Sequence, residues 1–524
     1  MKFQVVIFVA VAGAQDAEVG SRACAGCHAE IFAKYQQTGM ARSAGPVGAA
    51  GFQESFAHAE FTDPGSGADY RIGPTYQFNF ARAGTQGQRR LSWFIGSGNV
   101  GRSYLFGVDG FLFQAPVSYY SDTQKWDVSP GYQRKRTVEL TRSVETACLQ
   151  CHASRLQSLA GVPNRFAPVP FLEGGVSCER CHGGGRAHIS QMSARVRTGG
   201  LGIVNPAKLE AARRDGICAQ CHLTGAARVA RASNSRYRPG DLLSDSLAVF
   251  VWTGPNAEIA GATSHYEKLA QSKCKQASGG KLWCATCHDP HESWPVAQRA
   301  QRYRQACLSC HATKPCTGEA GPDCAGCHMP NRPTRSVDHL AYTDHSIARR
   351  PGSPLPTGTD RRLTNFWKGP SSERDLALGY AVVAPTEPSI RPHALDLLER
   401  AAAASPNDLP ILAQLAQFYD RLGREDEALA LCERLLKLEP THTAAAVNLG
   451  IYRMKHGRPA EAIKLWEAAL QRQPGLTGAR MNLAVAYYRA GNLAAAEAAL
   501  RKALDYEPDL DAARRMLAEL QAAK

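Results

Sequence analysis

Seven copies of one short pattern, Cys-x-x-Cys-His, take up fourteen of the 17 cysteines in this 524-residue chain. Cysteines at i and i+3 with a histidine at i+4 lie on adjacent turns of a short helix, so two thioether bonds can hold a porphyrin while the imidazole reaches its iron. A zinc site or a redox dithiol would explain a single copy, but seven copies favour covalently attached haem c, one group per motif. The cysteines are Cys24, Cys27, Cys148, Cys151, Cys178, Cys181, Cys218, Cys221, Cys284, Cys287, Cys307, Cys310, Cys324 and Cys327, and the motif histidines are His28, His152, His182, His222, His288, His311 and His328.

Further histidines between and after the motifs are candidates for the second axial position of the irons. His291 is too close to His288 to reach the far face of the same haem, so we expect it to serve a neighbouring one. Met40 could ligate the remaining iron, since methionine is an axial ligand in some cytochromes, and it could equally be core filler. For His58, in a strand-like setting, a structural role fits as well as ligation. The candidate histidines are His58, His188, His265, His291, His339 and His345.

The segments that must position these motifs make up the first part of the chain, residues 15–350. We expect this part to be mostly helical or irregular, followed by a linker at 351–372 that is rich in Pro, Gly and charge. Residues 52–146 lack motifs, are rich in aromatic residues and predict a β-rich insertion with short hairpins. "GSGNVG" at 96–101 is expected to be a glycine-rich turn, because the segment after it is β-like and a dinucleotide site needs a helix there.

The second part, residues 373–524, repeats with a fixed period. Pro406, Pro440, Pro474 and Pro508 are each 34 residues apart, and alanines and glycines keep the same step. This period resembles the tetratricopeptide repeat and implies an all-α solenoid whose surface docks a protein partner, although such arrays can also be scaffolds alone. Cys432 is expected to be a small buried residue of one repeat helix. The expected repeats are 373–406, 407–440, 441–474 and 475–508, with a capping helix at 509–524.

The N-terminus predicts export from the cytoplasm. Lys2, the apolar run "FQVVIFVAVAG" and the small residues of Ala12–Ala14 are typical of a signal peptide, here residues 1–14. No later segment is apolar for long enough to be a transmembrane anchor. We therefore expect a soluble periplasmic or extracellular protein, in which Cys274 and Cys316 could form a disulfide.

The basic charge of the chain is confined to the part with the motifs. The formal net charge is +14, and residues 373–524 contain 19 Lys and Arg against 20 Asp and Glu, so residues 1–372 carry +15. Seven haems would bring fourteen propionates, which need such cations as partners. This distribution argues against a nucleic-acid partner.

The haem region resembles the multihaem cytochrome c superfamily that includes hydroxylamine oxidoreductase and pentahaem nitrite reductase. The segments that carry the resemblance are "GVSCERCHGGGRAHI", "CATCHDPH", "CAGCHMP" and "HLAYTDH". It implies closely packed haems in an electron carrier, or in an oxidoreductase of small nitrogen or sulfur compounds. Nitrite reductases of this kind usually replace one motif histidine by lysine, and all seven motifs here end in histidine.

Three functions follow from these observations. The favoured one is a periplasmic multihaem cytochrome that transfers electrons and docks a redox partner through its repeats. The alternative is an oxidoreductase acting on a small nitrogen or sulfur compound at a five-coordinate haem. A third treats the repeats as the main function and the haems as sensors of redox state.

Overall fold

The structure is a computed structural model of the chain. It describes residues 18–49, 54–133, 135–159, 162–195, 201–232, 236–254, 264–312, 323–333, 341–348, 361–367, 369 and 371–522. The expected signal peptide at 1–14, His339 and Cys316 lie outside these residues. Among the helices of this part, none is both long and apolar enough to span a bilayer.

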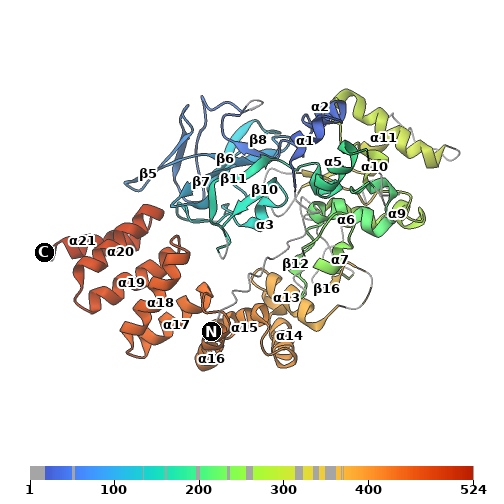
Figure 1. Ribbon diagram of the computed structural model, residues 1–524. Helices are drawn as coiled ribbons and strands as arrows, with labels where there is room; N and C mark the ends of the chain where they lie inside the picture. Colours follow the sequence, from blue (N-terminus) through green and yellow to red (C-terminus); the bar gives the residue numbers. More distant parts are fainter. Residues whose placement is uncertain are drawn as a thin grey trace, which may run out of the picture.

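Two antiparallel sheets form most of the β-rich region (Figure 1). The strand β4 (Gln77–Arg82) forms because its residues alternate: Phe78 and Phe80 enter the core, while the polar side chains between them face outward. Asp109 and Gly110 join β7 to β8 with φ values of 53° and 80°, as a tight hairpin requires. The five-stranded sheet has the order β1 (Ala44–Pro46), β6 (Trp93–Ile95), β7 (Gly101–Val108), β8 (Phe111–Tyr120), β9 (Lys125–Val128), and the four-stranded sheet has the order β2 (Glu60–Thr62), β3 (Asp69–Ile72), β4 (Gln77–Arg82), β5 (Thr85–Arg90).

Strands also occur outside the expected insertion, so the expectation of a mostly helical or irregular surround is wrong in part. The run "LAVFVWT" forms β13 because its β-branched and aromatic side chains suit a strand that is covered on both faces. Part of the expected linker is a strand as well. This segment pairs with β13 and buries Leu363 there. The additional strands are β10 (Ala153–Ser158), β11 (Phe166–Gly174), β12 (Ala227–Ala230), β13 (Leu247–Thr253), β14 (Asn331–Pro333), β15 (Ala341–Thr343) and β16 (Arg362–Asn365).

The helices of the motif region are short. The longest, α11, buries none of its own side chains, so it has little protein core to stabilise it. The helices are α1 (Ser21–Ala25), α2 (Ala29–Tyr35), α3 (Thr146–Leu149), α4 (Glu179–His182), α5 (Arg186–Ser193), η1 (Pro206–Lys208), α6 (Ala211–His222), α7 (Leu243–Ser246), α8 (His265–Gln271), α9 (Lys273–Ala277), α10 (Cys284–Cys287), α11 (Val296–His311) and α12 (Cys324–His328).

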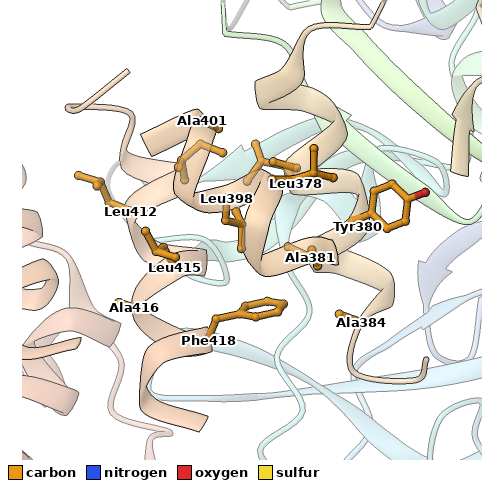
Figure 2. Close-up of a cluster of buried hydrophobic side chains, with 14 of the residues drawn as sticks. Leu378, Tyr380, Ala381, Ala384, Leu398, Ala401, Leu412, Leu415, Ala416 and Phe418 are labelled. Atoms are coloured by element: carbon orange, nitrogen blue, oxygen red, sulfur yellow. The ribbon is translucent and has the colours of Figure 1, made fainter. Parts of the chain in front are cut away.

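Helical hairpins make up the second part, one for each expected repeat. Gly423, Gly457 and Gly491 end the first helix of successive repeats with φ values of 72°, 72° and 73°, a conformation that glycine adopts without strain. Figure 2 shows Leu398, Leu415 and Phe418 pointing into the core between the helices of the first two repeats. The helices are α13 (Glu373–Val383), η2 (Pro388–Ile390), α14 (Arg391–Ala404), α15 (Leu409–Arg421), α16 (Glu425–Leu438), α17 (Thr443–Lys455), α18 (Pro459–Arg472), α19 (Thr477–Arg489), α20 (Leu493–Tyr506) and α21 (Asp511–Ala522).

The helical array is attached to the first part of the chain at both ends. At the start, α13 lies on the sheet β12-β13-β16 (Figure 1), and Phe250 of this sheet, 0% exposed, shares a core with the repeat helices. At the other end, the buried Asp509 carboxylate is 3.2 Å from Arg82 Nη1 and accepts the N–H of Val138 at 2.9 Å. The repeats are therefore packed against the rest of the chain.

Candidate haem-binding sites

In the first, third and fifth motifs the chain makes one helical turn, which places the two cysteines and the histidine on one side. The N–H of His28 donates to the carbonyl of Cys24 at 2.9 Å, and the N–H of His182 donates to Cys178 at 3.0 Å. The fifth motif repeats this bond at 2.9 Å between His288 and Cys284. This local geometry is the one that two thioether bonds and one axial imidazole require.

Motif histidines face histidines from elsewhere in the chain. Metal–imidazole bonds are about 2 Å long, so two imidazoles on opposite sides of one metal have ring centroids roughly 6 Å apart. The centroids of His28 and His188 are 6.5 Å apart with an angle of 18° between the rings. Those of His182 and His291 are 5.9 Å apart at the same angle. Both spacings fit one iron between the rings.

Two further pairs meet in one cluster. The centroids of His222 and His265 are 5.6 Å apart, and those of His288 and His345 are 6.3 Å apart. His265 and His345 themselves lie 4.9 Å apart, which brings the fourth and fifth motifs side by side. His182 belongs to the third motif and His291 follows the fifth, so His291 lies opposite the histidine of another motif, and its role as an iron ligand stays a prediction.

Backbone carbonyls hold one ring nitrogen of several of these histidines. Nδ1 of His182 lies 2.8 Å from the carbonyl of Val204, and Nδ1 of His188 lies 2.7 Å from that of Leu201. Nδ1 of His345 is bonded in the same way to Thr343 at 2.8 Å. Such a bond fixes the tautomer and leaves Nε2 to bind a metal. Carbonyl partners carry no side-chain signature, so the sequence could not reveal them.

The clustered imidazoles are neutral near pH 7. Burial, followed by the neighbouring His345 and His222, lowers the pKa of His265 to about 3. Burial and the same two neighbours lower the pKa of His288 to about 4. Burial also lowers the pKa of His182 below its usual value. A neutral imidazole is the form that ligates iron, so the chemistry of these side chains fits the group.

The remaining candidates are not brought into such pairs among the described residues. His152 is half-buried, and its Nδ1 has no hydrogen-bond partner there. His311 and His328 have no second imidazole beside them in the described part. Met40 lies near the second and third motifs, since its carbonyl accepts from Ser43 and Val176. His58 is exposed in the loop before β2.

The motifs themselves lie close to one another. The thiol of Cys24 neighbours that of Cys178, which places the first motif beside the third. Other neighbouring thiols join the second motif to the fourth and the fourth to the fifth, and the last three motifs follow one another along the chain. These neighbours are Cys151 and Cys221, Cys218 and Cys284, Cys287 and Cys307, and Cys307 and Cys324. Of the cysteines outside the motifs, Cys432 is buried in α16, as expected, and Cys274 is half-buried.

Family comparisons match separate stretches of the chain. Tetratricopeptide repeat families match residues 393–449 and 447–513. The doubled CXXCH motif family matches residues 275–315, and the cytochrome c554 and c-prime family matches residues 118–183.

Curated relatives are multihaem cytochromes of which this chain spans only a part. The C-type polyheme cytochrome OmcB of Geobacter sulfurreducens is 28% identical over 200 residues, which cover 32% of this chain and 25% of OmcB. The multiheme cytochrome MtrA of Shewanella baltica is 27% identical over 221 residues, which cover 38% of this chain and 64% of MtrA.

The solved structures that are similar cover less than a third of this chain. MamA of Desulfovibrio magneticus RS-1 is 24% identical, with 29% of this chain and 86% of that chain covered and a TM-score of 0.27. YrrB, a TPR protein with an unusual peptide-binding site, is 25% identical, with 27% and 73% covered and a TM-score of 0.25. The motifs and the family and sequence matches together support a multihaem c-type cytochrome that carries tetratricopeptide repeats.

Proposed function

We propose that the chain transfers electrons along seven covalently bound haems and docks a redox partner through its repeats. The observation that carries this proposal is the set of four imidazole pairs, each with a spacing that fits one iron. When bound, haem c supplies an iron that gains and loses one electron without making or breaking bonds to a substrate. Two imidazoles per iron leave no coordination position for a substrate, so these four sites favour a carrier over an enzyme.

The spacing of the motifs supports rapid electron movement. Neighbouring thiols connect the first motif with the third and the fourth with the fifth, so haems attached there would lie close together. The first part of the chain leaves fewer than fifty residues for each haem, and α11 buries none of its own side chains. We infer that the porphyrins form much of the apolar interior in this part of the chain.

An oxidoreductase is the second candidate, on the observation that three motif histidines have no second imidazole beside them among the described residues. One of them is His152, which is half-buried and whose Nδ1 has no hydrogen-bond partner there. An iron held there with an open position could bind a small nitrogen or sulfur compound. The resemblance of the haem region to the superfamily that includes hydroxylamine oxidoreductase would agree with such a reaction.

Low-temperature electron paramagnetic resonance of the oxidised protein separates these two functions. A carrier should give low-spin ferric signals equivalent to seven haems, unchanged by nitrite or hydroxylamine. A high-spin signal that shifts when either compound is added would overturn the carrier and support the oxidoreductase. The intact mass of the same sample gives the number of attached haems, and a mass that corresponds to far fewer than seven would contradict both functions.

The repeats offer a row of exposed basic side chains and a small hollow for the proposed partner, which together are called the groove below. Arg421, Lys455 and Arg489 are exposed at the same repeat position of α15, α17 and α19. Between α17 and α19 lies a hollow of about 180 Å³, with Trp466 and Val485 among its apolar lining and Lys455 and Arg489 among its charged lining. This combination suits a partner segment that presents carboxylates beside an apolar side chain.

The docking proposal is tested by reversing the charge of this groove. Arg421→Glu with Arg489→Glu should slow electron exchange with the native partner at least ten-fold and weaken its dependence on salt. Lys437→Glu, an exposed site on α16, is the matched control and should leave the rate unchanged. Equal rates for both variants would exclude this groove as the docking surface. Export to the periplasm belongs to the same proposal, and osmotic-shock release of the haem-loaded protein tests it.

A further inference from the structure

Glu179 is a buried carboxylate inside the third motif, directly after Cys178. The residue is 3% exposed. Its Oε1 accepts the N–H groups of Val19 and Gly185, both at 2.8 Å. Its Oε2 accepts the N–H groups of Gly20 at 2.8 Å and Val19 at 3.0 Å. No ion pair among the described residues includes Glu179, so backbone amides balance this charge there.

The donors to Glu179 stand at the starts of two different helices. Gly20 directly precedes α1, which contains Cys24 and leads to His28. Gly185 directly precedes α5, which contains His188. One carboxylate therefore joins the third motif to both elements that bring the imidazoles of His28 and His188 to a separation of 6.5 Å.

Other hydrogen bonds also hold the segment before α1, but among the described residues none of them involves α5. Ser21 donates its N–H to Glu173 Oε2 at 3.0 Å, and its hydroxyl accepts the N–H of Cys178 at 3.0 Å. A Cβ on Gly185 would come within 3.4 Å of Glu179 Oε1 and 3.2 Å of Val19 Cγ2, which shows how closely the start of α5 approaches this segment. Among these contacts, Glu179 is the side chain that bonds to both helix starts.

Replacing this carboxylate by an amide would disturb both helix starts while changing its volume little. An ionised carboxylate only accepts hydrogen bonds, whereas an amide has one accepting oxygen and one donating nitrogen. In Glu179→Gln, the amide nitrogen would replace Oε1 or Oε2 and face backbone N–H groups, which are donors themselves. The hydrogen bonds to the replaced oxygen are therefore lost. The strength that a charged acceptor adds to the bonds of the other oxygen is lost as well.

We propose that Glu179 is a positioning residue for the first haem, which sets the spacing between His28 and His188 and joins the first motif to the third. This inference rests on the proposed function, because it requires one iron between these two imidazoles. A role confined to folding the 178–182 segment would affect His182 and its partner His291, and would leave the first pair unchanged.

The test compares three variants of the full chain by low-temperature electron paramagnetic resonance. His188→Ala and His291→Ala identify the low-spin components of the first and third haems. Glu179→Gln should shift or remove the component that His188→Ala removes, equivalent to one haem of seven. Glu210→Gln, an exposed carboxylate at the start of α6, is the matched control and should leave every component in place. An unchanged spectrum of Glu179→Gln, or a change in the His291 component alone, would overturn the proposal.

Incomplete maturation of Glu179→Gln also gives a decisive result. Mass mapping of its peptides shows which motif lacks haem. Loss at residues 24–28 supports the positioning role, and loss confined to residues 178–182 refutes it. Failure of the proposed function is a separate outcome, because the unsubstituted protein would then lack haem or low-spin signals at these motifs.

Discussion

A histidine is a dependable iron ligand when one ring nitrogen is held and the other keeps a free lone pair. His182 and His345 meet both conditions, since backbone carbonyls hold Nδ1 and burial lowers the pKa of each imidazole. The carbonyl partner of His182 lies 22 residues further along the chain, at Val204. Loops between the motifs therefore have a definite task, which is to orient the rings that the motifs supply.

The pairing of His182 with His291 predicts what happens when the histidine outside the motif is removed. His291→Ala should leave the number of attached haems unchanged, because the thioether bonds and His182 remain, but one haem should become high-spin and bind cyanide or nitrite. Visible and electron paramagnetic resonance spectra measure this change. His58→Ala is the control, since His58 is exposed in the loop before β2, and it should leave all signals unchanged. If His58→Ala alone changes the spectrum, the assigned pairing is wrong.

At the scale of elements, the motif helices and the repeat helices are stabilised in different ways. The helices around the motifs are short, and α11 buries no side chain of its own. The repeat helices fit closely without a cofactor, as Trp466 of α18 lies over Gly450 of α17 and donates its indole N–H to the carbonyl of Val447 at 3.0 Å. Haem removal should therefore unfold the first part of the chain and leave the repeats folded.

Two glycine substitutions test the packing of the repeat helices. A Cβ on Gly450 would lie 2.4 Å from Trp466 Nε1, so Gly450→Ala should destabilise the repeats by about 1–3 kcal/mol through overpacking. Gly478 in α19 has open space around it, so Gly478→Ala should stabilise the same helices by about 0.5–1 kcal/mol. Hydrogen exchange of α17–α20 measures both changes. Equal effects of the two substitutions would contradict the close fit.

How far the sequence predicts these elements depends on whether the signal is local. The motifs and the 34-residue period depend on residue type and spacing. The structure brings His188, His265, His291 and His345 opposite motif histidines, and their ligand roles stay predictions. Which histidine faces which motif depends on long-range packing. The strand β16 was missed because four residues among prolines and glycines carry little pattern, and its partner β13 lies more than a hundred residues earlier.

At the scale of the whole molecule, the repeats bridge two distant parts of the first region. Asp509 and Arg82 are 427 residues apart in sequence, and Tyr506 donates its hydroxyl to Asp109 at 2.8 Å. At the other end, Gly379 of α13 lies so close to Phe250 that a Cβ there would be 2.7 Å from its ring. A partner bound to the repeats would therefore be connected mechanically to both the β-rich region and the sheet β12-β13-β16.

The contact at the far end is tested by Asp509→Asn. The substitution removes the charge that faces Arg82 and weakens the bond from Val138, so this contact should lose about 1–3 kcal/mol. Hydrogen exchange should then speed up in α21 and around residue 138, while the haem spectra stay unchanged. Asp511→Asn, whose carboxylate is 48% exposed, is the control and should have little effect. Faster exchange confined to α21 would show that the contact does not stabilise the β-rich region.

Two deletions separate the covering role of the first repeat from docking by the rest. Removing residues 373–524 would uncover Phe250, Val229 and Leu363. The full burial of each such side chain stabilises the fold by about 1.5–3 kcal/mol, so we expect this deletion to cause aggregation and incomplete haem attachment. Removing residues 407–508 keeps α13 and α14 over the sheet, and it gives up the contact of Tyr506 with Asp109 at the other end of the array.

The shorter deletion should therefore retain every attached haem and an unchanged resonance spectrum, while losing electron exchange with the proposed partner. Light scattering and intact mass compare the two proteins. A longer deletion that remains monomeric with every haem attached would show that α13 is not needed to cover the sheet. If α13 is needed, loss of activity in the longer deletion says nothing about docking, because a damaged haem region would abolish electron transfer whatever surface the partner uses.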